Sequence, residues 1–139
     1  MHANIRAGVI GLGAMGAPMA GHLAGVGLLT AVWNRTSAKS QDFSNKFDAS
    51  VSPDPAALAA SCNVILICVS SDSDVLDVVR LMLPGLQAGS VVIDTSTVSP
   101  STAVEVAATL SEIGVSFVDA PVSGGVEGAI KGTLSVMAG

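Results

Sequence analysis

Aromatic residues are scarce in this chain of 139 residues, which has three phenylalanines, one tryptophan and no tyrosine. Any mechanism that depends on a tyrosine hydroxyl is therefore excluded. Charge is scarce as well, because Asp, Glu, Lys and Arg together make up 12% of the residues, and the net charge is −5. The few basic residues are scattered and form no cluster. We therefore expect no nucleic-acid partner.

The two cysteines and the lack of a long apolar run further limit the class of protein that this chain can belong to. Cys62 and Cys68 do not have a C-x-x-C spacing, so we expect no structural disulfide, no metal site and, at Cys68, a buried thiol. The longest apolar run, residues 64–69, is too short to span a bilayer. The first residues, MHANIRAGVIGLG, lack the apolar stretch and cleavage site of a signal peptide. We expect a cytoplasmic protein that does not contact membranes.

The abundant residues are aliphatic, since 50% of the chain is hydrophobic, mostly as Val, Ile, Leu and Ala. Unbroken aliphatic runs are typical of strands that are buried on both faces of a sheet. They alternate here with helical patterns, which predicts βαβ units, a doubly wound and mostly parallel sheet, and three layers. Ser73 or Asp74 is expected to cap the fourth helix. Over residues 1–139 we expect one α/β domain, with strands at 5–10, 29–33, 49–51, 63–69, 90–93, 115–118 and 133–139, and helices at 14–26, 36–46, 55–61, 75–83 and 101–113.

A glycine-rich hexapeptide, GLGAMG, stands where the first predicted strand ends and the first helix begins. This G-x-G-x-x-G spacing in a strand–turn–helix context is the fingerprint of a Rossmann dinucleotide-binding loop. Gly11 would form the tight turn, Gly13 would let a pyrophosphate approach the backbone, and Gly16 would let the helix pack on the strand. The alternative is a turn without a ligand. The predicted pyrophosphate loop comprises Gly11, Leu12, Gly13, Ala14, Met15 and Gly16.

The end of the second predicted strand indicates which dinucleotide binds. A site for NAD carries Asp or Glu there to bind the ribose 2′-hydroxyl, but this chain has Asn34, Arg35 and Thr36. A guanidinium and a hydroxyl would pair with the 2′-phosphate that NADP carries, and Arg35 could also stack on adenine. We therefore expect NADP(H) to be preferred over NAD(H). The alternative for Arg35 is a solvated turn residue.

Several segments together resemble the β-hydroxyacid dehydrogenase family, which includes 3-hydroxyisobutyrate dehydrogenase and is related to 6-phosphogluconate dehydrogenase and the imine reductases. They are VIGLGAMGAPMAGHLA, NRT, CVSSDSD, DTSTVSP and, most specifically, DAPVSGGVEGAIKGTLSVMAG. The resemblance covers nearly the whole chain and implies the N-terminal NADP-binding domain of such a protein. It implies hydride transfer between NADP(H) and a small β-hydroxyacid or semialdehyde, of the 3-hydroxyisobutyrate, tartronate semialdehyde, glyoxylate or succinic semialdehyde type.

The resemblance also implies roles for residues that follow the predicted strands. Ligands of open α/β sheets bind beyond the carboxyl ends of the strands, which is where these residues are expected. On the residues alone, Ser70 and Thr97 fit equally well as turn or helix-cap residues, and the SGG segment fits as a loop. The implied cofactor contacts are Val69, Ser70, Asp74 and Thr97, and the implied substrate contacts are Ser123, Gly124 and Gly125.

The general acid/base lysine of the family has no counterpart here. Its motif, near G-x-x-x-K-x-x-N-N, belongs to a helix that would follow Gly139. Lys39 and Lys46 are expected on the second helix, far from the nicotinamide. Lys131 is expected in solvent and His22 on the first helix, as a surface or packed residue. Because hydride transfer to a carbonyl needs a proton donor, we expect the chain to bind NADP(H) with little or no turnover.

The resemblance also implies a second, all-helical domain through which the family's members form homo-oligomers, and we expect this chain to lack it. We therefore expect a cofactor-binding half, either a truncated protein or the product of a short gene. A stand-alone nucleotide-binding module without catalysis is the main alternative, and the missing lysine favours it. A relative that uses the fold for protein or chromatin contacts is disfavoured by the lack of a basic tail. Short-chain dehydrogenases are excluded because their Tyr-x-x-x-Lys pair needs a tyrosine.

Overall fold

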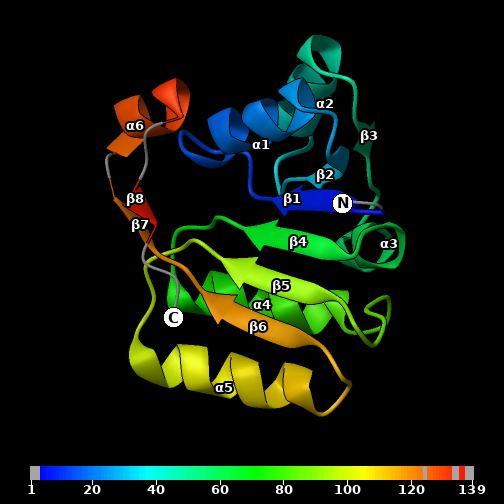
Figure 1. Cartoon of the computed structure of the whole chain (residues 1–139), viewed down its shortest axis with the longest axis vertical. Coiled ribbons are helices and arrows are strands. Elements are labelled where there is room, and N and C mark those ends of the chain that lie inside the picture. Colours follow the sequence, from blue (N-terminus) through cyan, green and yellow to red (C-terminus); the bar gives the residue numbers. More distant parts are fainter. Residues whose placement is uncertain (1–3, 124, 133–134, 137–139) are drawn as a thin grey trace.

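The computed structural model describes residues 4–123, 125–132 and 135–136, and it confirms a three-layer α/β fold (Figure 1). Six strands form one sheet in the order β3-β2-β1-β4-β5-β6, and every neighbouring pair is parallel. The strands are β1 (Ala7–Ile10), β2 (Leu29–Trp33), β3 (Ser50–Val51), β4 (Val64–Ile67), β5 (Val91–Asp94) and β6 (Ser116–Asp119). The helices are α1 (Gly16–Gly25), α2 (Ser37–Lys46), α3 (Pro55–Ser61), α4 (Asp72–Met82), α5 (Pro100–Ser111) and α6 (Gly125–Lys131).

Helices cover both faces of the main sheet, which explains why its central strands are aliphatic throughout. In β1, Val9 packs in one core with Ala20 of α1 and Phe43 of α2. The next residue, Ile10, belongs to a second core that includes residues of α3, α4 and α5. Successive side chains of a strand point to opposite faces, so both must be apolar here. Across the described ranges, no helix has the length and apolarity that crossing a bilayer requires.

The start of α4 differs from the prediction. The helix begins at Asp72 and its cap is Ser71, whose Oγ accepts a hydrogen bond from the backbone N–H of Asp74 at 3.2 Å. The expectation that Ser73 or Asp74 caps this helix is therefore wrong, because both lie in its first turn. The earlier start places the carboxylates of Asp72 and Asp74 at the positive end of the helix dipole, where negative charge is stabilising.

The glycine-rich segment after β6 contains a helix, α6, that the sequence patterns did not predict. Lys131 pairs with Glu127 at 2.7 Å along α6. The Nε2 of His22 in α1 donates to the carbonyl oxygens of Ala129 and Ile130, each at 3.0 Å, and so ties α6 to α1. The short strands β7 (Val122–Ser123) and β8 (Ser135–Val136) form a separate antiparallel pair. The predicted last strand, where it is described, therefore lies outside the main sheet.

Candidate functional site

β1 lies at the point of the sheet where the strand order reverses. Its neighbours are β2, which follows it in the chain, and β4, which starts the other half of the sheet. At such a switch point the loops after the two central strands diverge and leave a crevice for a ligand. Segment 11–16 follows β1 and therefore lies at this crevice, together with the loop that follows β4.

The three glycines of segment 11–16 have different environments. Gly11 has a φ of +102°, and a Cβ there would lie 1.9 Å from the carbonyl oxygen of Cys68. A Cβ on Gly16 would lie 1.9 Å from the carbonyl oxygen of Gly11. These two positions need glycine for the protein's own backbone. A Cβ on Gly13 would meet no atom of the described residues within 4 Å, so the loop leaves at Gly13 the space that a phosphate needs.

The N-terminus of α1, beside this loop, is suited to an anionic group. Its N-cap residue, Met15, forms no side-chain cap hydrogen bond, and neither does Thr36 at the start of α2. The helices α3, α4 and α5 are capped by the side chains of Asp54, Ser71 and Ser99. The first N–H groups of a helix have no partner inside the helix and carry partial positive charge. Loop and helix end together therefore fit the diphosphate of a dinucleotide.

A cavity of about 220 Å³ at the crevice brings together most of the predicted cofactor residues. The predicted cofactor residues that do not line it are Leu12, Ala14, Met15, Gly16 and Thr97. Lys39, in the first turn of α2, does line it and was not predicted as a site residue. Its position in the first turn of the helix that directly follows the Asn34-Arg35-Thr36 turn is the signal that would have identified it. The predicted residues that line this cavity are Gly11, Gly13, Asn34, Arg35, Thr36, Val69, Ser70 and Asp74.

The turn after β2 uses its two long polar side chains differently. Asn34 accepts through Oδ1 from the backbone N–H of Leu12 at 2.8 Å and donates through Nδ2 to the carbonyl of Thr36 at 3.1 Å, which joins this turn to the glycine loop. Arg35 instead reaches α4, where its Nη2 lies 3.1 Å from Oδ1 of Asp74. The Arg35 side chain is 65% exposed, and one ion pair leaves most of its five donors free for a further anion.

Asp94, at the end of β5, is a fully buried carboxyl group that sequence reasoning missed. Its Oδ1 accepts from the backbone N–H of Ser96 at 2.9 Å, and Ser96 Oγ accepts from the backbone N–H of Val69 at 2.9 Å. Burial raises the pKa of Asp94, and the nearby carboxylate of Asp119 raises it further. These bonds fix the loops after β4 and β5 against each other at the crevice. A lone aspartate directly after the run VVI was the available signal.

The predicted substrate segment is described only in part. Ser123 ends β7, Gly125 begins α6, and Gly124 lies outside the described residues. Two side chains that could transfer a proton, those of His22 and Lys131, already have partners in or near α6. His22 bonds two backbone carbonyls, and Lys131 pairs with a glutamate.

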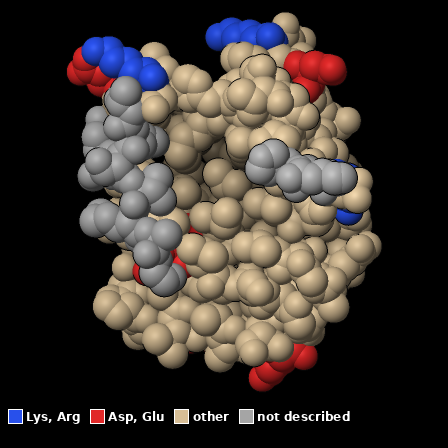
Figure 2. Space-filling model, in the orientation of Figure 1, with Lys and Arg blue, Asp and Glu red and all other residues tan. Residues whose placement is uncertain are grey.

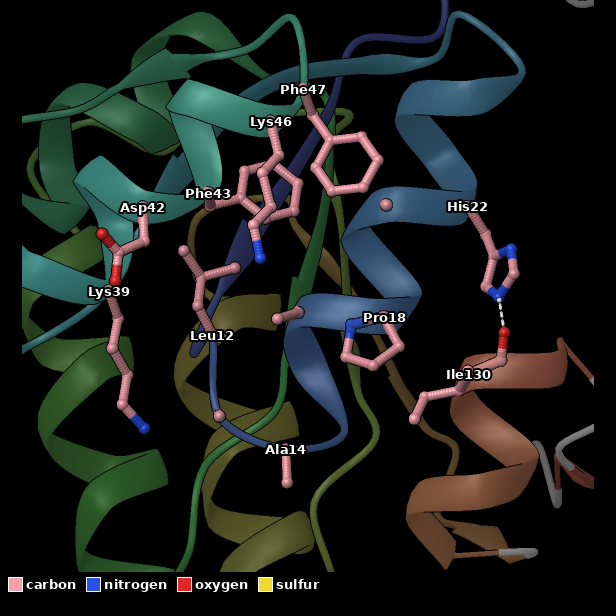
Figure 3. Close-up of a pocket in the computed structure, with 13 residues that line it drawn as sticks. Leu12, Ala14, Pro18, His22, Lys39, Asp42, Phe43, Lys46, Phe47 and Ile130 are labelled. Carbon is pink, nitrogen blue, oxygen red and sulfur yellow. Dashed lines mark hydrogen bonds between the residues drawn. The ribbon is translucent and has the colours of Figure 1, made fainter.

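A larger cavity of about 720 Å³ adjoins the first, between α1, α2 and α6 (Figure 3). Gly13 and Lys39 line both cavities, while Leu12 and Ala14 of the predicted loop line this one alone. The rest of the wall of this larger cavity is mainly apolar and includes Pro18, Phe43, Phe47 and Ile130. On the face of the molecule that Figure 2 shows, charged side chains lie at the margins and the middle is uncharged.

The strand order, the switch point and the glycine loop define a dinucleotide-binding domain of the Rossmann class. Comparison with known families narrows this class. Residues 6–139 match the model of the NAD binding domain of 6-phosphogluconate dehydrogenase, and the chain belongs to this family. The resemblance to the β-hydroxyacid dehydrogenases is confirmed by similar proteins that carry those names.

Three similar proteins illustrate the relation. The probable 3-hydroxyisobutyrate dehydrogenase-like 1, mitochondrial, of Arabidopsis thaliana is 40% identical in an alignment of 140 residues that covers 98% of this chain and 42% of that protein. The solved 3-hydroxyisobutyrate dehydrogenase of Mycobacterium tuberculosis with L-serine has a TM-score of 0.91 at 31% identity, over 97% of this chain and 46% of that one. The structure of Psf3 in complex with NADP+ and 2-OPP has a TM-score of 0.87 at 34% identity, over 95% and 48%. The chain thus spans slightly less than half the length of these relatives.

Proposed function

We propose that the chain binds NADP(H) in preference to NAD(H), as the cofactor-binding part of an oxidoreductase for small β-hydroxyacids or semialdehydes. The observation that carries the proposal is the cavity at the switch point. Three side chains suited to a phosphate, those of Arg35, Thr36 and Lys39, line the same cavity as the open side of the glycine loop at Gly13. No carboxylate directly follows β2, where an NAD site carries one.

Each part of this crevice has a proposed role. Backbone N–H groups of segment 13–16 bind the diphosphate, and the guanidinium, hydroxyl and ammonium groups of Arg35, Thr36 and Lys39 bind the 2′-phosphate. Asn34 holds the turn and the loop in register. The bound cofactor supplies the hydride chemistry. The nicotinamide end is proposed at Val69, Ser70 and Thr97, and the substrate carboxylate or hydroxyl at Ser123, Gly124 and Gly125.

Reduction of a carbonyl also needs a proton donor. Among the described residues that line the crevice, the one ammonium group is that of Lys39, which is proposed for the phosphate end. We therefore propose that the proton donor of the whole protein lies on a further segment and that this chain alone binds cofactor with little turnover. From the family resemblance we also propose that the whole protein is a cytoplasmic homo-oligomer. A stand-alone nucleotide-binding module is the second candidate, and the same lack of a donor favours it.

Replacement of Arg35 by aspartate tests the cofactor preference. Arg35→Asp is expected to weaken NADPH binding more than tenfold, about 1.4 kcal/mol or more, and to spare NADH, because only NADPH has a 2′-phosphate. Calorimetric titration with both nucleotides measures the two dissociation constants.

Arg80→Asp is a matched control for this experiment. Arg80 is similarly exposed and forms a similar ion pair, with Asp77 at 3.1 Å, but it does not line this cavity. The control is expected to leave both dissociation constants unchanged. An equal loss of NADPH and NADH binding in Arg35→Asp would refute the role of Arg35 at the 2′-phosphate.

A further inference from the structure

Asp74 is a carboxylate that faces the proposed phosphate site from the opposite half of the sheet. It lies in the first turn of α4, after β4, and its Oδ1 pairs at 3.1 Å with Nη2 of Arg35, which follows β2 and lies 39 residues away in the chain. Both residues line the cavity at the switch point. The ion pair therefore spans the crevice between the two loops that would enclose the adenosine end of a dinucleotide.

We propose that Asp74 is a specificity-determining residue, which competes with the cofactor 2′-phosphate for Arg35 and thereby limits the preference for NADP(H) over NAD(H). The inference rests on the proposed function, since it concerns the same site. It goes beyond that function because it assigns to one carboxylate the balance between the two cofactors.

The charges along the cavity support this role. Of the described residues that line it, Arg35 and Lys39 carry positive charge and Asp74 alone carries negative charge. A 2′-phosphate that approaches Arg35 meets a carboxylate already paired with the guanidinium, so binding must overcome both the existing attraction and a like-charge repulsion. NADH has a 2′-hydroxyl in place of the phosphate and meets neither obstacle.

Solvent exposure sets the size of the expected effect. The Asp74 side chain is 26% exposed and that of Arg35 is 65% exposed, so water and salt screen the pair. Exposed ion pairs contribute up to about 1 kcal/mol, which corresponds to about fivefold in a dissociation constant. We therefore expect a three- to fivefold change, larger at low ionic strength.

Helix α4 permits a clean substitution at this position. The Ser71 cap bonds the backbone N–H of residue 74 and not its side chain, so Asp74→Asn leaves the cap in place. Asp77, three residues further along α4, forms an ion pair of the same length with Arg80 and does not line the cavity. Asp77→Asn is thus a matched control for the loss of one carboxylate from the same helix.

The test is calorimetric titration of the wild-type chain and the two variants with NADPH and with NADH at low and at moderate salt. The NADPH dissociation constant is expected to fall three- to fivefold in Asp74→Asn, that for NADH to change less than twofold, and both to be unchanged in Asp77→Asn. Asp74→Ala is expected to lower the NADPH dissociation constant as well.

Two kinds of failure are distinguishable in this experiment. If the wild type binds NADPH but Asp74→Asn binds it equally or more weakly, Asp74 does not compete with the phosphate and the inference is overturned, while the proposed function stands. If the folded wild type binds neither nucleotide, the proposed function fails and the inference fails with it.

Discussion

Among the single residues of the site, Gly13 differs from Gly11 and Gly16, because packing within the fold does not require glycine at Gly13. At Gly11 and Gly16 the protein's own carbonyl groups leave no room for a side chain. At Gly13 no protein atom does so, and the residue has no left-handed backbone conformation. Close approach of a ligand to the backbone is one use of glycine, and the place of Gly13 in the loop after β1 favours that use there.

Alanine substitutions test this distinction. Gly13→Ala is expected to fold with an unchanged or slightly raised melting temperature, because the added methyl group meets no protein atom, and to lose at least tenfold in NADPH affinity. Gly16→Ala is expected to lose about 3 kcal/mol or more of stability, because its Cβ would overlap the carbonyl of Gly11. Thermal melts and nucleotide titrations measure both. Full NADPH affinity in Gly13→Ala would show that no phosphate approaches the loop there.

Residue roles could be predicted from the sequence only where the chemistry is local. The glycine spacing and the Asn34-Arg35-Thr36 turn are readable because their meaning depends on adjacent elements. The partners of Asn34 and Ser96 are not readable in this way. Leu12 lies 22 residues from Asn34, and the bond from Val69 to Ser96 spans 27 residues, so these contacts exist only after the sheet has aligned the strand ends.

At the scale of elements, Asp72 joins the start of α4 to the start of α5. Its Oδ2 accepts from the hydroxyl of Ser99 at 2.6 Å, from the hydroxyl of Thr102 at 2.7 Å and from the backbone N–H of Ser99 at 3.1 Å. These hydrogen bonds, first that of the Ser99 hydroxyl, favour the ionised form and hold the pKa of Asp72 below its ordinary value of 3.8. The two helices therefore begin in a fixed relation beside the crevice.

We predict a pH-dependent loss of stability in Asp72→Asn. Because the pKa is lower in the folded than in the unfolded protein, the carboxylate contributes stability that is present above pH 3.8 and is lost as the pH falls through the folded value. The variant should melt below the wild type at pH 7, and the gap should narrow below pH 3.8. Thermal melts over this range measure it, with Asp77→Asn as control. A difference in melting temperature that stays constant with pH would show that the ionised carboxylate of Asp72 does not supply this stability.

The strands were predictable as elements, and the last helix was not. Aliphatic runs mark the central strands β1, β4 and β5, because burial between two helical layers demands them. Helix α6 lies in a glycine-rich segment with no apolar periodicity, and contacts from another element, the bonds from His22, support it. The cap of α4 was misplaced because all five residues from Ser70 to Asp74 are serine or aspartate, so each of them is a candidate cap near the helix start.

In the whole molecule, the candidate site lies at the carboxyl ends of the strands of the main sheet. The central strands are buried between two helical layers, and the loops at their carboxyl ends carry the glycine loop, the Arg35–Asp74 pair and the Asp94 network. The fold class follows from the alternation of strands and helices, which is why it could be predicted from the sequence. The large cavity beside α6 could not, because it depends on how a short helix docks on α1.

Calorimetric titration of the folded 139-residue chain with NADPH, with circular dichroism to confirm the fold, measures whether the crevice binds a dinucleotide. We expect saturable one-to-one binding of NADPH that is tighter than that of NADH. A folded chain that gives no binding heat with either nucleotide at several temperatures would contradict it.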